Sequence, residues 1–210
     1  MFKTLTTCVV SLCIAGSASA DLVNPLVPDW RGDANTTFAQ WDSFTSADGG
    51  PNAPEQGFGY NLFNFGTGAI IAGSGNIYGA GGGLNIHVYP AGAPLFNLQE
   101  AVLNISFAGS PINTDNVRAY VGDQGTGEYF DMAGTFQGGG GSDFSPQTWS
   151  FTVDLSGAER GFQSLSFFFG SELANTSLDA ISVDVLGSAI PAPGALFGLG
   201  LLGVARRRRS

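Results

Sequence analysis

The strongest constraint on the fold is an alternation of apolar and polar side chains with a period of two residues. It is clearest in the last third of the chain, in the segments 149–155, 165–169 and 181–185. Successive side chains of a β-strand point to opposite faces of a sheet, so this period predicts strands with one face in a core and a polar opposite face. A helix needs apolar residues three and four positions apart, and no segment of three helical turns shows that spacing.

Shorter segments of the same kind come earlier, with glycine-rich turns between them. The strands expected before residue 149 are 37–44, 58–65, 69–72, 76–78, 84–89, 102–107, 117–121 and 129–136. Residues 21–35, 47–56 and 138–141 are rich in turn-forming residues and are expected to be irregular. About ten short strands at this spacing, with 17 Phe to fill a core, predict an all-β fold, an antiparallel β-sandwich over residues 21–188.

The first 20 residues have the pattern of a secretory signal peptide. Lys3 is followed by an apolar stretch over 5–15, and Ala18-Ser-Ala20 supplies the small residues that a signal peptidase requires. We therefore expect cleavage between Ala20 and Asp21. Both cysteines, Cys8 and Cys13, lie in this peptide, so the mature chain is expected to have no disulfide and no thiol chemistry.

Residues 189–210 combine a proline-rich break, an apolar run and a basic end. Pro191, Ala192 and Pro193 stop any incoming strand, because proline lacks an N–H group. Residues 194–205 carry no charge and would form a helix of about 18 Å, short against a bilayer core of about 30 Å. The four arginines that follow, Arg206, Arg207, Arg208 and Arg209, are expected to stay on the cytoplasmic side.

This tail resembles the PEP-CTERM sorting signals of bacteria that produce exopolysaccharide. The resemblance covers residues 190–210, with Ala192 where the commonest motif has Glu. It implies an exosortase-type membrane protease as partner, cleavage near Pro191–Pro193, and release or transfer of the body at the cell surface. Many bodies of such proteins are jelly-roll-like and end in Asp-x-Ile/Val-x-Val, which Asp179-Ala-Ile181-Ser-Val183 matches.

The charge of the expected mature body is strongly negative. All 17 acids lie between Asp21 and Asp184, and three arginines with no lysine oppose them, which gives residues 21–188 a net charge of −14. Such a surface repels nucleic acid and anionic lipid. It is compatible with cation binding or with neutral glycans.

Few enzyme mechanisms fit the residues present. His87 is the single histidine, on the polar side of an expected strand, and we expect a surface ring rather than a catalytic base. One histidine and no cysteine in the body make zinc, copper and haem sites improbable. The glycine runs lack the Lys-Ser/Thr of a phosphate-binding loop. Glycoside hydrolysis needs two carboxylates, so a hydrolase stays open, but we predict a protein that is not an enzyme, with no catalytic and no metal-binding residues assigned.

Two kinds of ligand site remain as candidates. Sugars stack on aromatic faces, which Trp30, Trp41, Tyr60 and Tyr89 could provide; the alternative for each is core packing. Calcium could bind oxygen ligands within 33–37 or 123–128, although neither has EF-hand spacing and solvated loop acids explain both.

The sequence therefore predicts a secreted protein of the cell surface or extracellular matrix that is not an enzyme and has no cofactor. A carbohydrate-binding module, calcium-stabilised or not, is the first alternative, with exopolysaccharide as its ligand. A two-carboxylate glycoside hydrolase is the second.

Overall fold

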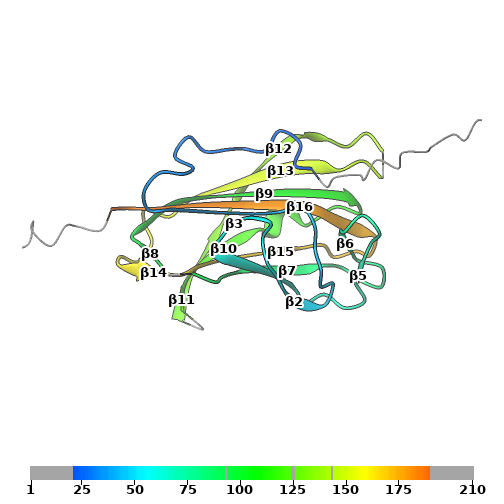
Figure 1. Ribbon diagram of the computed structural model, residues 1–210, viewed down its shortest axis with the longest axis horizontal. Coiled ribbons are helices and arrows are strands. Elements are labelled where there is room, and N and C mark those ends of the chain that lie inside the picture. The colour runs from blue at the N-terminus through cyan, green and yellow to red at the C-terminus, as the bar shows by residue number, and fades with distance from the viewer. Residues whose placement is uncertain (1–20, 93, 124–125, 143, 190–210) are drawn as a thin grey trace, which may run out of the picture.

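Two antiparallel sheets packed face to face form the body of the protein (Figure 1). The computed structural model describes residues 21–189, except 93, 124, 125 and 143. Every strand pairing in this part of the chain is antiparallel, so the predicted all-β antiparallel sandwich is confirmed.

The first sheet has eight strands. Its main path runs in the order β12 (Ala133–Gly139), β13 (Gln147–Asp154), β9 (Leu98–Gly109), β16 (Thr176–Gly187), β1 (Thr36–Trp41) and β3 (Gln56–Gly57). A short hairpin extends it, in which β6 (Ile77–Tyr78) pairs with β16 and with β5 (Ile70–Ile71).

The second sheet has six strands, in the order β11 (Thr126–Asp131), β10 (Arg118–Asp123), β15 (Leu165–Gly170), β7 (Asn85–Pro90), β4 (Tyr60–Asn64) and β2 (Gly49–Asn52). A separate two-stranded ladder joins β8 (Leu95–Phe96) to β14 (Phe162–Gln163), and one 3₁₀ turn covers Thr114–Asn116.

The core lies between the two sheets and follows the alternation in the sequence. In the central strand pair, β9 and β16, Ile105 lies opposite Ile181 and Leu103 lies opposite Val183. All four side chains are fully buried. The second sheet contributes the alternate residues of its own central strands, including Leu62, Val88 and Phe167. One face of each sheet is thus apolar because every second residue is apolar.

Three local predictions need correction. Residues 129–136 are not one strand, because the chain leaves the second sheet at Met132, which is 6% exposed, and continues as β12 in the first. Residues 47–56 are not wholly a loop: edge strand β2 lies within them, anchored where the Asn52 side chain accepts hydrogen bonds from the N–H groups of Thr45 and Ser46. Strand β12 likewise extends into the glycine run at 138–141, with a bulge between Phe136 and Gly138.

The segment 21–33 has no strand, as predicted, but it is fixed across the outer face of the first sheet (Figure 1, blue). The Leu26 N–H donates to Asn104 Oδ1 at 2.9 Å, and Asn104 Nδ2 donates to the Leu26 carbonyl at 3.1 Å. Nearer its start, the Val23 N–H donates to Thr148 Oγ1 at 2.8 Å. We call residues 21–33 the covering segment.

The predictions for the two ends of the chain lie outside the described residues. These are the signal peptide 1–20, the motif Pro191, Ala192 and Pro193, and Arg206–Arg209. Within residues 21–189, where placed, no helix is long and apolar enough to cross a membrane.

Candidate functional site

The outer face of the second sheet is covered with aromatic rings. Six side chains from strands β4, β7, β10, β11 and β15 point away from the core. The side chain of Phe65, which follows β4 in the sequence, lies on the same side. We call these seven residues the aromatic face: Phe63, Phe65, His87, Tyr89, Tyr120, Tyr129 and Phe168. Their inward neighbours in sequence, such as Leu62, Val88 and Phe167, are fully buried, so the same alternation that builds the core places the rings outside.

Phe168 lies at the centre of this layer. Its ring centroid is 4.7 Å from that of His87, 5.9 Å from that of Tyr89 and 5.9 Å from that of Tyr129. The layer extends on one side through Tyr129 to Tyr120, at 4.7 Å. On the other side it extends from His87 to Phe65, at 4.8 Å. Contacts at these distances join rings from five strands into one continuous surface.

Part of this surface is hollowed into a groove of about 780 Å³. Its lining combines rings, hydroxyls and bare backbone: His87, Tyr89, Pro90, Tyr120, Gly122, Gly127, Tyr129, Ser164, Ser166 and Phe168. A Cβ atom at Gly127 would lie 2.3 Å from the Val121 carbonyl oxygen and 2.7 Å from Cζ of Tyr120, so only glycine fits between this backbone and the Tyr120 ring. The volume falls within the range of small-ligand sites, about 300–1,000 Å³.

The hydrogen bonds of His87 indicate which of its ring nitrogens carries the proton. Its Nε2 lies 3.0 Å from Asn85 Oδ1, an acceptor, and its Nδ1 lies 2.8 Å from the Tyr89 hydroxyl. The arrangement assigns the proton to Nε2 and makes Nδ1 the acceptor from Tyr89. Partial burial lowers the pKa of His87, so the ring is neutral at pH 7.

One ion pair borders the aromatic face. Arg118 Nε donates to Asp131 Oδ1 at 3.0 Å, and register places both next to the face, with Arg118 opposite Phe168. Burial, and secondarily Tyr129, raises the pKa of Tyr89, which keeps its phenol protonated. The seven residues of the face therefore present rings and hydroxyls without net charge.

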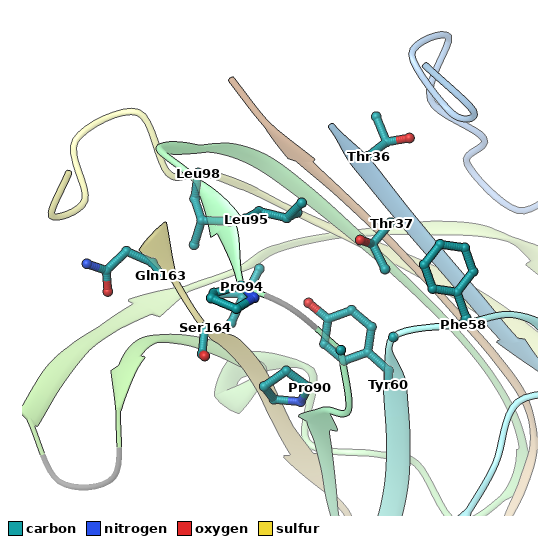
Figure 2. Close-up of a pocket in the computed structure, with 13 residues that line it drawn as sticks. Thr36, Thr37, Phe58, Tyr60, Pro90, Pro94, Leu95, Leu98, Gln163 and Ser164 are labelled. Atoms are coloured by element: carbon teal, nitrogen blue, oxygen red, sulfur yellow. The ribbon is translucent and has the colours of Figure 1, made fainter. Parts of the chain in front are cut away.

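Two of the four sequence-predicted ligand residues are core residues. Trp41 is fully buried, with its Nε1 donating to the Asn52 carbonyl at 3.0 Å, and Tyr60 is 5% exposed. Neither offers a ring face to a ligand, because each points inward from its strand. Tyr60 does border a smaller cavity of about 230 Å³ near Thr37 and Pro94 (Figure 2), below the usual size of a ligand pocket.

The other two lie on opposite sides of the sandwich. Trp30 is half-buried in the covering segment, and its Nε1 donates to Glu100 Oε2 at 3.4 Å. Tyr89 belongs to the aromatic face. Sequence reasoning missed the remaining rings of that face, although the aromatic residues at every second position in 58–65 and 84–89 were a usable signal.

The residues that line the aromatic groove include no carboxylate pair. The described residues contain no group of three or more His, Cys, Asp or Glu placed to hold a metal ion. In the first segment proposed for calcium, the Asp33 carbonyl accepts a hydrogen bond from Thr36 Oγ1. Four well-formed cavities in the described part of the chain are each lined by at most one carboxylate, and the aromatic groove has none.

Comparisons with known proteins give little further information. No family model matches the chain, and no curated protein matches it. Among solved structures it is similar to the N-terminal cellulose-binding domain of β-1,4-glucanase C from Cellulomonas fimi, at 18% identity over 71% of this chain and 84% of that one, with a TM-score of 0.22. A TM-score this low supports no conclusion about a ligand.

Proposed function

We propose that this protein binds a neutral polysaccharide on the aromatic face. The observation that carries the proposal is the continuous layer of seven rings on a sheet face, two of which are strongly exposed: Tyr129 at 58% and Phe65 at 49%. Exposed apolar patches of this kind mark binding surfaces in soluble proteins. Aromatic rings pack against the C–H faces of sugars, while hydroxyls and amides bind sugar hydroxyls.

The charge distribution favours a neutral ligand over an acidic one. The face is uncharged, and the body around it carries a net charge of −14 from three arginines and 17 acids. An anionic polysaccharide would meet repulsion from this charge, and Arg118, which lies opposite Phe168 on the same side of the sheet, is already paired with Asp131. A neutral one would encounter only rings, hydroxyls and the groove of about 780 Å³.

The protein acts, in this proposal, by binding and not by catalysis. A two-carboxylate hydrolase needs both acids within several ångströms of the bound sugar, and the described lining of the groove holds no carboxylate. The predicted signal peptide and PEP-CTERM-like tail would bring the body to the cell surface or matrix, with an exosortase-type protease removing the tail. The exopolysaccharide of the producing cell is then the natural ligand.

The test is a binding measurement on residues 21–189, which contain all the described strands. Affinity electrophoresis and calorimetry would compare neutral polymers (β-glucans, mannans, galactans) with anionic ones such as alginate. We expect saturable binding to a neutral polymer, weakened at least tenfold by Tyr129→Ala and by Phe168→Ala.

Phe162→Ala is the matched control. Phe162 is also 58% exposed, but it lies on β14, outside the second sheet, and its ring packs against Phe96 and none of the seven rings of the face. Equal loss of affinity in Phe162→Ala and Tyr129→Ala, or selective binding of alginate, would refute the proposal.

A further inference from the structure

A buried carboxylate outside the aromatic face has an oxygen without a partner. Asp179 is 5% exposed and sits at a β-bulge in β16, between Leu178 and Ala180. Its Oδ1 accepts a hydrogen bond from Asn76 Nδ2 at 2.5 Å, while its Oδ2 has no hydrogen-bond partner among the described residues. A buried charge needs a counter-charge or it destabilises the fold.

None of the three arginines of the body forms an ion pair with Asp179. Arg31 is bound to Asp184, Arg118 is bound to Asp131, and Arg160 donates to the Ser156 carbonyl at 2.7 Å. The body contains no lysine. Any positive charge for this carboxylate must come from elsewhere in the protein or from solution.

The start of the covering segment lies beside this carboxylate. The Asp21 carbonyl accepts a hydrogen bond from Ser106 Oγ at 3.3 Å, and Ser106 pairs across the sheet with Ala180, the residue after Asp179. Burial raises the pKa of Asp179, the hydrogen bond from Asn76 opposes that rise, and the nearby Asp21 carboxylate adds to it. The backbone of Asp21 therefore lies close to a buried carboxyl group that has no cationic partner among the described residues.

We propose that the N-terminal ammonium of the mature chain, created by cleavage between Ala20 and Asp21, forms a buried ion pair with Asp179. Hydrolysis of that peptide bond by a signal peptidase consumes one water. Ala20 gains a carboxyl group, and the Asp21 nitrogen becomes an amino group that takes up a proton at neutral pH. One neutral N–H donor is thereby replaced by a positive charge with three donors, so processing completes the fold at the end of the covering segment.

The pH dependence has a defined sign. An α-amino group has an ordinary pKa of about 7.7–8.0, and the partner carboxylate raises it in the folded protein. The pair therefore stabilises the fold fully between the pKa of Asp179 and about pH 7.7; the gain disappears as pH rises through the folded-state pKa of the amino group, and it is also lost at acid pH when Asp179 is protonated. The titratable groups facing it are the carboxylates of Asp21 and Asp179; the other contacts, Asn76 and Ser106, do not titrate.

The test compares residues 21–210 with a free Asp21 amino group and the same chain acetylated at that nitrogen. A fusion protein cut by a protease that leaves no added residue supplies the free form. At pH 7 we expect the folded-to-unfolded ratio of the free form to be about tenfold higher, equivalent to one pKa unit of differential interaction. The difference should vanish at high pH.

A second readout does not depend on stability. The Asp21 α-amino pKa, measured by ¹⁵N NMR, should lie above the ordinary range and return to it in Asp179→Asn, while Asp131→Asn leaves it unchanged. An ordinary pKa in the unsubstituted chain, or equal stability of the free and acetylated forms, would overturn the pair. So would stabilisation of both forms by added Ca²⁺, or an exported protein whose mass shows an N-terminus other than Asp21.

Discussion

The outer faces of the two sheets differ in what covers them. On the first sheet, most of the buried outward residues are polar, and the covering segment hydrogen-bonds to several of them. The buried polar members are Asn104, Ser106, Thr148, Ser150, Ser182 and Asp184. On the second sheet, the outward residues are aromatic and stay partly exposed. A polar face can be sealed by backbone that matches its donors and acceptors, whereas a face of rings offers few such partners.

The contrast separates stability from binding. Substitutions under the covering segment should unfold the protein without a specific effect on ligand, because buried polar groups lose their partners. Substitutions on the aromatic face should weaken ligand binding with little effect on unfolding. Each prediction below tests one side of this contrast.

The largest effect is expected at the ion pair beneath the covering segment. Arg31 Nε and Nη2 donate to both oxygens of Asp184 at 2.5 and 2.6 Å, and the Asp184 side chain is fully buried. Arg31→Met should lower the free energy of unfolding by about 3–5 kcal/mol, because it leaves an uncompensated buried charge. Urea denaturation at pH 7 measures the change.

The pH dependence of this variant identifies the cause. Burial already raises the pKa of Asp184, and Arg31 opposes that rise, so Arg31→Met should raise the pKa further. A carboxyl group whose pKa is higher in the folded protein than in the unfolded chain favours the folded state at a pH below the unfolded-state pKa, and this contribution is lost as pH rises. The difference in free energy of unfolding between Arg31→Met and the unsubstituted protein should therefore shrink towards pH 4. Arg118→Met, at an exposed pair, should cost less than about 1 kcal/mol; a similar cost in both variants would contradict the explanation.

The next effect is expected at Asn104. Its side chain bonds to both backbone groups of Leu26 and to the hydroxyls of Ser150 and Ser182. Asn104→Ala should lower the free energy of unfolding by about 2 kcal/mol, since it leaves buried groups unpaired, and should expose the covering segment to proteases.

Asn61 provides the comparison on the open sheet. It lies on β4 opposite Tyr89 and is half-exposed. Asn61→Ala should change stability by less than about 0.5 kcal/mol, as for an ordinary surface substitution. If limited proteolysis cut the Asn61→Ala and Asn104→Ala variants equally fast, the two faces would not differ as described.

On the aromatic face, Tyr129→Ala should leave stability nearly unchanged. The ring is 58% exposed, so its removal should cost about 1 kcal/mol or less. The same substitution should weaken binding of a neutral polysaccharide at least tenfold. Thermal unfolding and binding calorimetry on the same sample would show whether affinity falls without a loss of stability. A large loss of both affinity and stability would show that the Tyr129 ring has a structural role.

The smallest effect concerns His87. Because burial lowers its pKa, the folded protein takes up this proton less readily than the unfolded chain does. The neutral ring therefore stabilises the fold fully above about pH 6.5, and part of that stability is lost as pH falls below that value. Affinity for a neutral glycan should also fall below pH 6 in the unsubstituted protein, but not in His87→Gln. A flat affinity from pH 5 to 8 would remove His87 from the binding surface.

The sequence predicted the sheets better than their surroundings. The period of two identified strands such as 149–155 and 181–185, because alternation reports which face is buried. It could not reveal that the outward Ser182 and Asp184 are also buried, since that depends on the covering segment, 150 or so residues away in sequence: Arg31 and Asp184 are 153 positions apart.

The candidate site shows the same limit. Tyr89 was identified, whereas Tyr120 and Phe168 were not, because their proximity to Tyr89 depends on the strand order β10-β15-β7. Residue type makes Trp41 and Tyr60 candidates for a ligand site, with core packing as the alternative, and the structure shows core packing for both. Both residues occupy strand positions whose side chains point into the core, and this position in the alternation decides whether a side chain is exposed.

The pairing of β1 with β16 also determines when the fold can be completed. These strands are the first and last of the main sheets, and Thr36 pairs with Leu186. A chain that emerges from its N-terminus cannot close the first sheet until residue 187 has appeared. Such long-range pairing slows folding. Until then β9, the other neighbour of β16, keeps one edge unpaired, so the nascent chain is most exposed to aggregation just before its last strand arrives.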